Sequence, residues 1–371
     1  MTTLRAATAL LLAALASGCV RSYKTEPVLS FQDFPYTSLQ GQAWPLQRLR
    51  LEKTAQLYNV ATVPEVAYVQ LNPEGKQTLV FIHGLGSYLK FWRYQLDAFA
   101  AQGYRVVAVD LPGYGKSDKP ASFPYTMEAM ADVVREVVTS LGIEKPILVG
   151  HSMGGQTALS YAIRYPEEPG ALVLTAPAGF EKFSAKEKAW FKRVFSTVLI
   201  KSAPEYGIWG SVRQSNFSRW RPELEWLIEE RVRVAASPGF DSYAYANVRT
   251  VDGLAHNDFV RDSLGRIQAP TLIVFGEDDR LIPNPFLHGG RAREVMAYGH
   301  AGIRGSELVG LDRCGHSVQL DCPEEYNAAV SAFLKKVPGS GGAEPRQEAP
   351  PVAPTEPAPP AAESTPPPTR P

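Results

Sequence analysis

Five short apolar runs constrain the fold of this chain more than any other feature. They read QTLVFIHG (77–84), YRVVAVD (104–110), PILVGHS (146–152), ALVLTAP (171–177) and TLIVFGE (271–277). Val, Ile and Leu follow one another in these runs instead of alternating with polar residues, which is typical of strands covered by helices on both faces. Stretches with helical patterns, among them 126–141 and 153–165, separate the runs. This alternation predicts an α/β fold with a doubly wound, mostly parallel sheet.

Two further stretches extend this sheet. Residues 64–71 (PEVAYVQL) predict an early antiparallel strand, and residues 307–312 (ELVGLD) predict a late strand, followed by a helix over 323–335. Residues 179–265 break the alternation, because they are rich in aromatic and charged side chains at helical spacing. We therefore expect a helical insertion there. The core is expected over 46–178 and 266–337.

Within the expected insertion, one apolar stripe stands out. The stretch AWFKRVFSTVLI (189–200) places on one helical face Trp190, Phe191, Val194, Phe195 and Val198. Such a stripe more often packs a helix onto the body of its protein, and we expect this of most of its residues. The alternative is that the stripe lines an acyl pocket or forms a lid.

The N-terminal stretch has the layout of a secretory signal. Residues 1–18 carry one early positive charge, an apolar run too short to span a bilayer, and small residues before Cys19. The ending Leu-Ala-Ser-Gly-Cys resembles a bacterial lipobox, which implies that Cys19 is acylated and that 19–45 is a tether and lead-in. An ordinary signal with an incidental cysteine is the alternative. The lipobox implies a lipid-anchored protein of the bacterial cell envelope, preferably at the outer membrane because no Asp follows the cysteine.

Composition excludes a packed C-terminus and a nucleic-acid partner. Residues 338–371 hold twelve prolines in 34 positions and almost no large apolar side chain, which predicts a disordered tail. The 38 Lys and Arg residues balance 38 Asp and Glu residues. Since no basic cluster stands out, nucleic acid is not expected as a partner.

The run at 146–152 leads into a candidate catalytic motif. Gly150-His151-Ser152-Met153-Gly154 fits the pattern Gly-x-Ser-x-Gly. Between an expected strand and an expected helix, this pattern is typical of a nucleophile elbow, a tight turn that presents the serine at the strand end. The two outer glycines let the turn close without a Cβ clash. The helix that follows offers backbone N–H groups and a partial positive charge to a developing oxyanion.

Four motifs make the chain resemble the α/β-hydrolase superfamily, of the capped, lipase- or esterase-like kind, over about 64–335. They are the elbow, His83-Gly-Leu-Gly86 at the end of the third strand, the loop Asp110-Leu-Pro-Gly-Tyr-Gly-Lys-Ser117, and Gly276-Glu-Asp-Asp279-Arg-Leu-Ile-Pro283 followed by Gly315-His316. Their order along the chain, Ser then Asp then His, is that of the α/β-hydrolase triad. The resemblance implies a helical cap over 179–265, inserted after the sixth strand.

The resemblance also implies a role for each member of the triad. Ser152 is the expected nucleophile, His316 the expected base and Asp279 the expected acid. Asp279 takes the acid position in the pattern Gly-x-x-Asp-x-x-x-Pro, with Asp278 as the alternative. Gly-His-Ser occurs twice in the chain, around Ser152 and around His316. The site is expected to take the serine from the first copy and the histidine from the second.

Neighbours of these residues are expected to complete the site. The backbone N–H groups of Leu85 and Met153 are expected to bind the oxyanion. His83 and His151 stand next to the oxyanion turn and the nucleophile, and we expect both to orient the local backbone.

Two cysteines flank His316, and two interpretations of them are open. In a chain expected to be exported, a disulfide between Cys314 and Cys322 would lock the histidine loop. Alternatively, the first is a small buried residue and the second an incidental residue at a helix start. A strand end and the next helix start need not bring their Cα atoms within ~7 Å.

Hydrolysis of carboxylic esters, of the esterase or lipase type, is the function that these features predict. The triad would act through an acyl-enzyme on a small-molecule or lipid ester. The sequence has no metal-ligand cluster, phosphate loop or dinucleotide fingerprint, so neither a metal nor a cofactor is expected. A C–C bond hydrolase, an acyltransferase or a perhydrolase could use the same triad. A non-catalytic envelope binding protein on the same scaffold is a further alternative.

Overall fold

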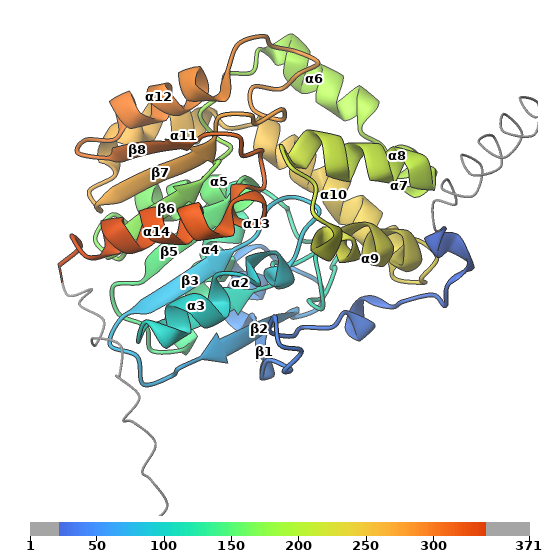
Figure 1. Cartoon of the computed structure of the whole chain (residues 1–371), viewed down its shortest axis with the longest axis horizontal. Coiled ribbons are helices and arrows are strands. Elements are labelled where there is room, and N and C mark those ends of the chain that lie inside the picture. The colour runs from blue at the N-terminus through green and yellow to red at the C-terminus, as the bar shows by residue number, and fades with distance from the viewer. Residues whose placement is uncertain (1–21, 339–371) are drawn as a thin grey trace, which may run out of the picture.

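Eight strands form one sheet in the computed structural model, which describes residues 22–338. Their order across the sheet is β1-β2-β4-β3-β5-β6-β7-β8 (Figure 1). The strands are β1 (Leu46–Arg50), β2 (Glu65–Leu71), β3 (Thr78–Ile82), β4 (Arg105–Val109), β5 (Ile147–His151), β6 (Ala171–Thr175), β7 (Thr271–Gly276) and β8 (Glu307–Leu311). β2 pairs antiparallel with β1 and β4, and the other neighbouring pairs are parallel. The predicted mostly parallel α/β sheet is confirmed.

Burial explains the sequences of the strands. Every residue of β3, β5, β6 and β7 is buried, so neither face of these strands has room for polar side chains. β1 lies at the edge of the sheet and reads LQRLR, with four of its five residues exposed. A short, charged strand protects the open edge of a sheet from pairing with other chains. Because these charges interrupt any apolar run, the sequence did not predict β1.

Helices cover both faces of the sheet. Figure 1 shows α3 and α14 in front of it and α4 and α5 behind it. The helices of the core are α2 (Glu52–Leu57), η3 (Leu89–Trp92), α3 (Leu96–Ala101), α4 (Met127–Ser140), α5 (Met153–Arg164), α11 (Asp258–Ser263), η6 (Leu264–Arg266), α12 (Ala292–Gly302), α13 (Val318–Asp321) and α14 (Pro323–Leu334). α4 begins where its sequence indicates, because the hydroxyl of Thr126 caps the first turn by accepting a hydrogen bond from the N–H of Ala129.

Between β6 and β7 the chain forms a helical insertion. Its elements are α6 (Ala185–Val194), α7 (Thr197–Lys201), α8 (Glu205–Gly210), the π-helical turn η4 (Ser211–Ser215), η5 (Pro222–Leu224), α9 (Trp226–Val234) and α10 (Phe240–Ala255). In Figure 1 these helices lie to the right of the sheet, beside the ends of the parallel strands. The insertion therefore covers the edge of the sheet at which an α/β fold usually binds its ligand.

The stretch 189–200 forms two helices and not one. Phe195 leaves the helical conformation with a ψ of 111°, and the side chain of Ser196 caps α7 by accepting from the N–H of Leu199. Val198 consequently does not share the face of Trp190, and it is 71% exposed. The prediction of one continuous stripe was wrong at Val198, because a serine at a helix start competes successfully for the backbone N–H groups.

Residues 22–45, predicted to be a tether and lead-in, are packed against the fold. This segment begins with η1 (Tyr23–Thr25) and η2 (Phe31–Asp33). Its buried aromatic side chains are Tyr23, Phe31, Phe34, Tyr36 and Trp44. The ring of Phe34 stacks on Tyr88 at 4.6 Å, and the hydroxyl of Tyr36 donates to Asp110 at 2.6 Å. The tether prediction was wrong from residue 22 onward, because the aromatic residues along the segment are each buried against the folded chain.

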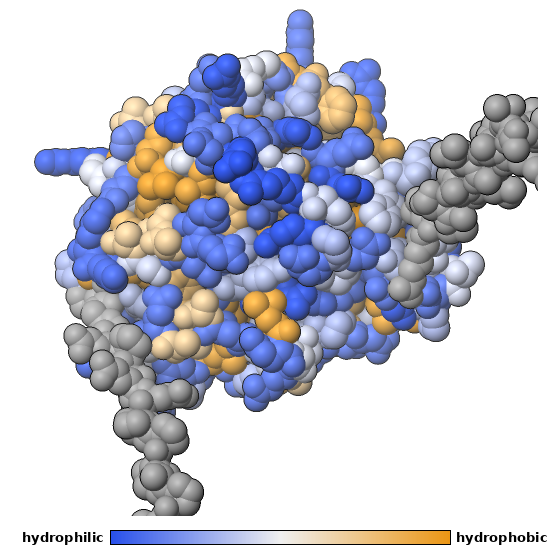
Figure 2. Space-filling view, in the orientation of Figure 1, coloured by the Kyte–Doolittle hydropathy of each residue, from blue (hydrophilic) through white to orange (hydrophobic). Residues whose placement is uncertain are grey.

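Three further predictions concern residues at the ends of the chain, beyond the range 22–338. The predicted signal over 1–18, the predicted lipidation site Cys19 and the predicted tail from 339 onward lie outside the described residues. Within residues 22–338, no helix has the length and apolar character needed to cross a membrane. Polar residues dominate the face in Figure 2, with small apolar patches between them.

Candidate active site

Ser152 lies at the tip of a strained turn between β5 and α5. Its φ is 51° and its ψ is −112°, a conformation that costs energy for a residue with a Cβ and that is typical of a nucleophile elbow. Glycines allow the turn to close, because a Cβ at Gly150 would collide with the carbonyl oxygen of Gly154. The N–H of Ser152 donates to the carbonyl of Thr175 at 2.9 Å. This bond fastens the turn to the end of β6.

Two backbone N–H groups beside Ser152 have no acceptor in the part of the chain that the structure describes. They belong to Leu85 and Met153. Met153 is the first residue of α5, where N–H groups are unpaired and the helix carries a partial positive charge. Leu85 follows Gly84, where an added Cβ would lie 3.3 Å from the Cβ of Ser152. Both N–H groups expected from the sequence are thus adjacent to the serine.

His316 and Asp279 form a buried pair. Nδ1 of His316 donates to Oδ2 of Asp279 at 2.8 Å, and the two side chains are 5% and 0% exposed. The N–H groups of Leu281 and Ile282 donate to Oδ1 of Asp279 at 2.8 Å and 3.1 Å. Because the carboxylate only accepts, the proton of the neutral imidazole lies on Nδ1, which leaves Nε2 as the basic nitrogen.

The two carboxylates that precede Asp279 face other partners. The hydroxyl of Ser218 donates to Asp278 at 2.5 Å. Glu277 pairs with Arg293. The structure therefore puts Asp279, and neither of its neighbours, against the imidazole.

Two buried histidines brace the loops around the serine. Nε2 of His151 donates to the backbone carbonyl of His316 at 3.1 Å. Nδ1 of His83 donates to the carbonyl of Gly84 at 2.8 Å, and its Nε2 accepts from the N–H of Leu111 at 3.0 Å. Burial lowers the pKa of His83 to about 4, and burial together with the neighbouring His316 lowers the pKa of His151 well below its ordinary range. Both rings are therefore neutral at physiological pH.

The loop that carries His316 is closed by a disulfide. Cys314 and Cys322 are bonded, with their Cα atoms 6.0 Å apart. Of the two interpretations that the sequence left open, the structure has the bridge. The strand end and the helix start come close because the chain turns back between β8 and α14.

The helical insertion also holds this loop. Asp321 accepts from the N–H groups of Gly315 and Ser218, each at 2.7 Å. The N–H of Ser317 donates to the carbonyl of Asn216 at 2.9 Å. Asp321 was missed in the sequence, where nothing distinguishes it from any other acidic residue near a helix start.

Ser152 and His316 line the same cavity. Among the described residues, no hydrogen bond joins their side chains directly. Catalytic hydrogen bonds of this kind often tighten only when substrate is bound.

Comparison with known proteins agrees with this geometry. The family model described as alpha/beta hydrolase fold matches residues 77–323. The chain belongs to this family. The matched segment of the hydrolase includes the elbow, the oxyanion loop, Asp279 and His316.

Proteins similar to this hydrolase carry different enzyme names. A 2-hydroxy-6-oxononadienedioate/2-hydroxy-6-oxononatrienedioate hydrolase of Paraburkholderia phymatum is 31% identical over 273 residues, which cover 70% of this chain and 88% of the relative. The structure of a probable hydrolytic enzyme from Pseudomonas aeruginosa PAO1 is 26% identical with a TM-score of 0.71, and the match covers 84% of this chain and 99% of that one. An esterase from Exiguobacterium antarcticum is 25% identical with a TM-score of 0.61, covering 74% and 96%.

The cavity beside Ser152 in this α/β hydrolase is large and mostly apolar. Its volume is about 710 Å³. The insertion contributes much of the wall, including Trp190, Phe191, Val194, Phe195 and Leu199. The expectation that most of the stripe only packs the insertion onto the core was therefore wrong, since four of its five residues line the cavity. The spacing of apolar residues along a helix does not show whether they contact packed side chains or line a cavity.

Glu181, another lining residue, belongs to a polar cluster that the sequence analysis missed. His288 bonds through Nδ1 to Glu181 and through Nε2 to Glu187 at 3.1 Å, and its ring stacks on Phe183. The cluster joins the loop after β6, the start of α6 and the loop after β7. Its members stand far apart in the sequence, and no local motif marks them.

Proposed function

We propose that this α/β hydrolase cleaves carboxylic esters through an acyl-enzyme on Ser152. The observation that carries the proposal is the apolar cavity at the candidate nucleophile. Among its described lining residues, Glu181 is the one Asp, Glu, Lys or Arg side chain. A neutral, apolar acyl group suits such a wall, because burying it releases ordered water and requires no counter-charge.

The mechanism follows from the arrangement of the side chains. The hydroxyl oxygen of Ser152 attacks the acyl carbon while Nε2 of His316 takes its proton. Asp279 holds the imidazole in the required tautomer and stabilises its protonated form. His316 then passes the proton to the leaving alcohol, and water attacks the acyl-serine by the same route in reverse.

The backbone N–H groups of Leu85 and Met153 would stabilise the oxyanion in each step. They are unpaired in the described chain, so no existing hydrogen bond has to break when charge develops. Each such donor typically lowers the barrier by about 2.7–4 kcal/mol.

Cleavage of a C–C bond is the second candidate. The similarity to the Paraburkholderia phymatum hydrolase favours it, and that relative's name gives a dicarboxylate substrate. A carboxylate in the large cavity would meet Glu181 and no Lys or Arg side chain among the described residues that line it. The large cavity therefore offers this substrate no counter-charge, whereas it suits a neutral acyl group.

One experiment separates these candidates. A fluorophosphonate probe should label the native hydrolase and fail to label Ser152→Ala, and p-nitrophenyl esters from acetate to palmitate should be cleaved, with a preference for apolar acyl chains that fill the cavity. Absence of labelling in the folded native protein would exclude a serine hydrolase. Faster turnover of 2-hydroxy-6-oxononadienedioate than of any ester would favour the C–C hydrolase instead.

We also propose that the helical insertion acts as a cap and that a lipid on Cys19 attaches the hydrolase to the cell envelope. The lipobox-like sequence supports the anchor. The described chain begins near the insertion, where the hydroxyl of Ser22 donates to Glu205 of α8 at 2.7 Å, so a lipid on Cys19 would bring the insertion close to a membrane. Radiolabelled palmitate should enter the native protein and not Cys19→Ala. Equal labelling, or an unchanged location of the variant, would contradict the anchor.

A further inference from the structure

A second cavity adjoins the one that contains Ser152. Its volume is about 290 Å³. The residues that line both cavities are Leu85, Phe91, Ser211, Asn216 and Ser317. Leu85 carries an unpaired N–H group and Ser317 follows His316, so the two cavities meet next to the candidate reacting centre. A substrate whose carbonyl lies there has room for one group in each cavity.

The second cavity contains a guanidinium group. Among the described residues that line it, Arg231 of α9 is the one with a charged side chain. Its Nη2 donates to the carbonyl of Ile200 at 3.2 Å, whereas its Nη1 is buried and has no acceptor within the described chain. The guanidinium lies over the ring of Phe240, 4.6 Å from the ring centroid. A guanidinium that lines a cavity without a carboxylate partner favours an anionic ligand group there.

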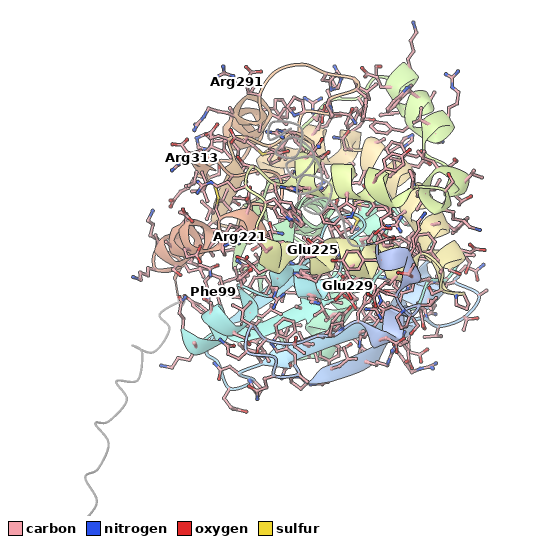
Figure 3. All side chains as sticks on the ribbon, turned by 45° about the vertical axis from the view of Figure 1, so that its right-hand side comes forward. Phe99, Arg221, Glu225, Glu229, Arg291 and Arg313 are labelled. Atoms are coloured by element: carbon pink, nitrogen blue, oxygen red, sulfur yellow. A yellow bond between two sulfur atoms is a disulfide. The ribbon has the colours of Figure 1, made fainter. Side chains whose placement is uncertain are left out.

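The carboxylates next to Arg231 on α9 are bound by other cations. Glu229, labelled in Figure 3, accepts from Arg233 at 2.6 Å. Glu230 pairs with Lys90. Within residues 22–338, Arg231 itself forms no ion pair with an acidic side chain. The helix thus balances its other charges and leaves that of Arg231 uncompensated beside the cavity.

We propose that the second cavity binds the leaving alcohol of the ester, and that Arg231 selects alcohols that carry a carboxylate or a phosphate. The inference rests on the proposed ester hydrolysis and names its substrate class: an apolar acyl group joined to an anionic alcohol. The acyl group occupies the large cavity and the anion contacts the guanidinium of Arg231.

Arg231 changes no bond in this reaction. Ser152 Oγ forms a bond to the acyl carbon, the bond from that carbon to the alcohol oxygen breaks, and the alcohol leaves with the proton carried by His316. Arg231 is a specificity residue, which holds the anion of the alcohol before and during this step. Its contribution should therefore appear as a difference between charged and neutral alcohols of one shape.

Matched esters test the inference. The first pair joins hexanoate to meta-hydroxybenzoate or to meta-hydroxybenzamide, and the second joins it to glycerol phosphate or to glycerol. The native hydrolase should show a kcat/KM about tenfold higher for the anionic member of at least one pair, because charge-assisted hydrogen bonds are the strong ones. Preference in the first pair indicates a carboxylate ligand and preference in the second a phosphate ligand.

Substitution of Arg231 should remove this preference. Arg231→Gln should lower kcat/KM for the anionic ester about tenfold, mainly through KM, and leave the neutral ester within about twofold. Arg231→Lys should keep part of the preference, since it keeps the charge. Arg233→Gln is the matched control on the same helix, and its ratio should equal the native one.

Two results would overturn the inference: equal rates on charged and neutral esters by the native hydrolase, or an equal loss on both esters in Arg231→Gln at an unchanged melting temperature. Both leave ester hydrolysis itself intact. Failure of the native hydrolase on every ester would instead contradict the proposed function, and the inference with it.

Discussion

At the scale of the single residue, Asp279 organises the candidate site through three hydrogen bonds. Two backbone N–H groups hold one of its oxygens, and His316 binds the other. An amide in its place could present an N–H group to Nδ1 and so favour the wrong imidazole tautomer, with the proton on Nε2.

Asp279→Asn should therefore lower kcat on a p-nitrophenyl ester by roughly 10³–10⁴, with little change in folding. Asp278→Asn is the control, because that carboxylate bonds to Ser218 and not to the imidazole. Its kcat should stay within about twofold of the native value. A comparable loss in both variants would contradict the assignment of Asp279 as the acid.

His288 gives a second residue-scale prediction, because its environment changes its pKa. Burial lowers the pKa of His288, but the hydrogen bonds and charges of Glu181 and Glu187 outweigh burial and raise it above the ordinary value of 6.5. A raised pKa in the folded state stabilises the fold fully below 6.5, and this contribution is lost as pH rises through the folded pKa.

Melting temperatures measured across this pH range should show the effect. His288→Gln should flatten the decline in melting temperature of the native protein above pH 6.5. His300→Gln is the control, since that ring bonds to the hydroxyl of Ser306, and it should keep the native slope. An unchanged slope in His288→Gln would show that the cluster adds no pH-dependent stability.

At the scale of the element, a buried ion pair joins the helical insertion to the core. Lys90 of η3 and Glu230 of α9 are bonded and only 3% and 4% exposed. Tyr88 donates its hydroxyl to the same carboxylate, and the ammonium of Lys90 lies 4.2 Å from the ring centroid of Trp226. Because these groups come from two different elements, the pair fixes where α9 sits relative to the sheet.

Removing one member of this pair should destabilise the fold, whereas replacing both members with apolar residues should not. Glu230→Gln leaves the Lys90 ammonium buried without its counter-charge, so the free energy of unfolding should fall by about 3–5 kcal/mol in urea titrations. The double variant Lys90→Met, Glu230→Leu should recover most of this loss, because apolar side chains of similar volume avoid the desolvation penalty. A double variant as unstable as the single one would contradict this expectation and would point to the acceptor that Tyr88 loses when Glu230 becomes Leu.

At the scale of the whole molecule, the N-terminal segment 22–36 straps the insertion to the core. Its first turn bonds to the insertion, because the hydroxyl of Tyr23 donates at 2.6 Å to Glu225, which Figure 3 labels just before α9. Its other end bonds to the core through Tyr36 and the buried Asp110. Burial raises the pKa of Asp110 to about 6, although the Tyr36 hydroxyl and nearby N–H groups oppose this shift.

Truncation of a buried ring in this strap should destabilise the entire fold. Phe34 is 2% exposed, so Phe34→Ala should reduce the free energy of unfolding by about 3–5 kcal/mol. Val28 is 54% exposed, and Val28→Ala in the same strap should stay within about 0.5 kcal/mol of the native protein. If urea titrations find an unchanged free energy of unfolding in both variants, the segment behaves as a tether.

Local patterns in the sequence were sufficient for seven of the eight strands and for the elbow. β3 to β7 were predictable because strands buried on both faces leave unbroken apolar runs, and the elbow because its glycines and serine are contiguous. β1 and the strap were not, because the charges of an edge strand and aromatic residues at irregular spacing match no period.

What the sequence determined by itself was therefore the α/β class, the order of seven of the eight strands along the chain, and a set of candidate residues that the structure brings to one edge of the sheet. The tertiary structure alone decided which groups contact one another. His316 bonds to Asp279 and not to Asp278, and Arg231 lines a second cavity without an acidic partner in the described chain. Lys90 pairs with Glu230, which lies 140 positions away in the chain. The physical reason is that periodicity reports how one segment is buried, whereas a site depends on which distant segments pack against each other.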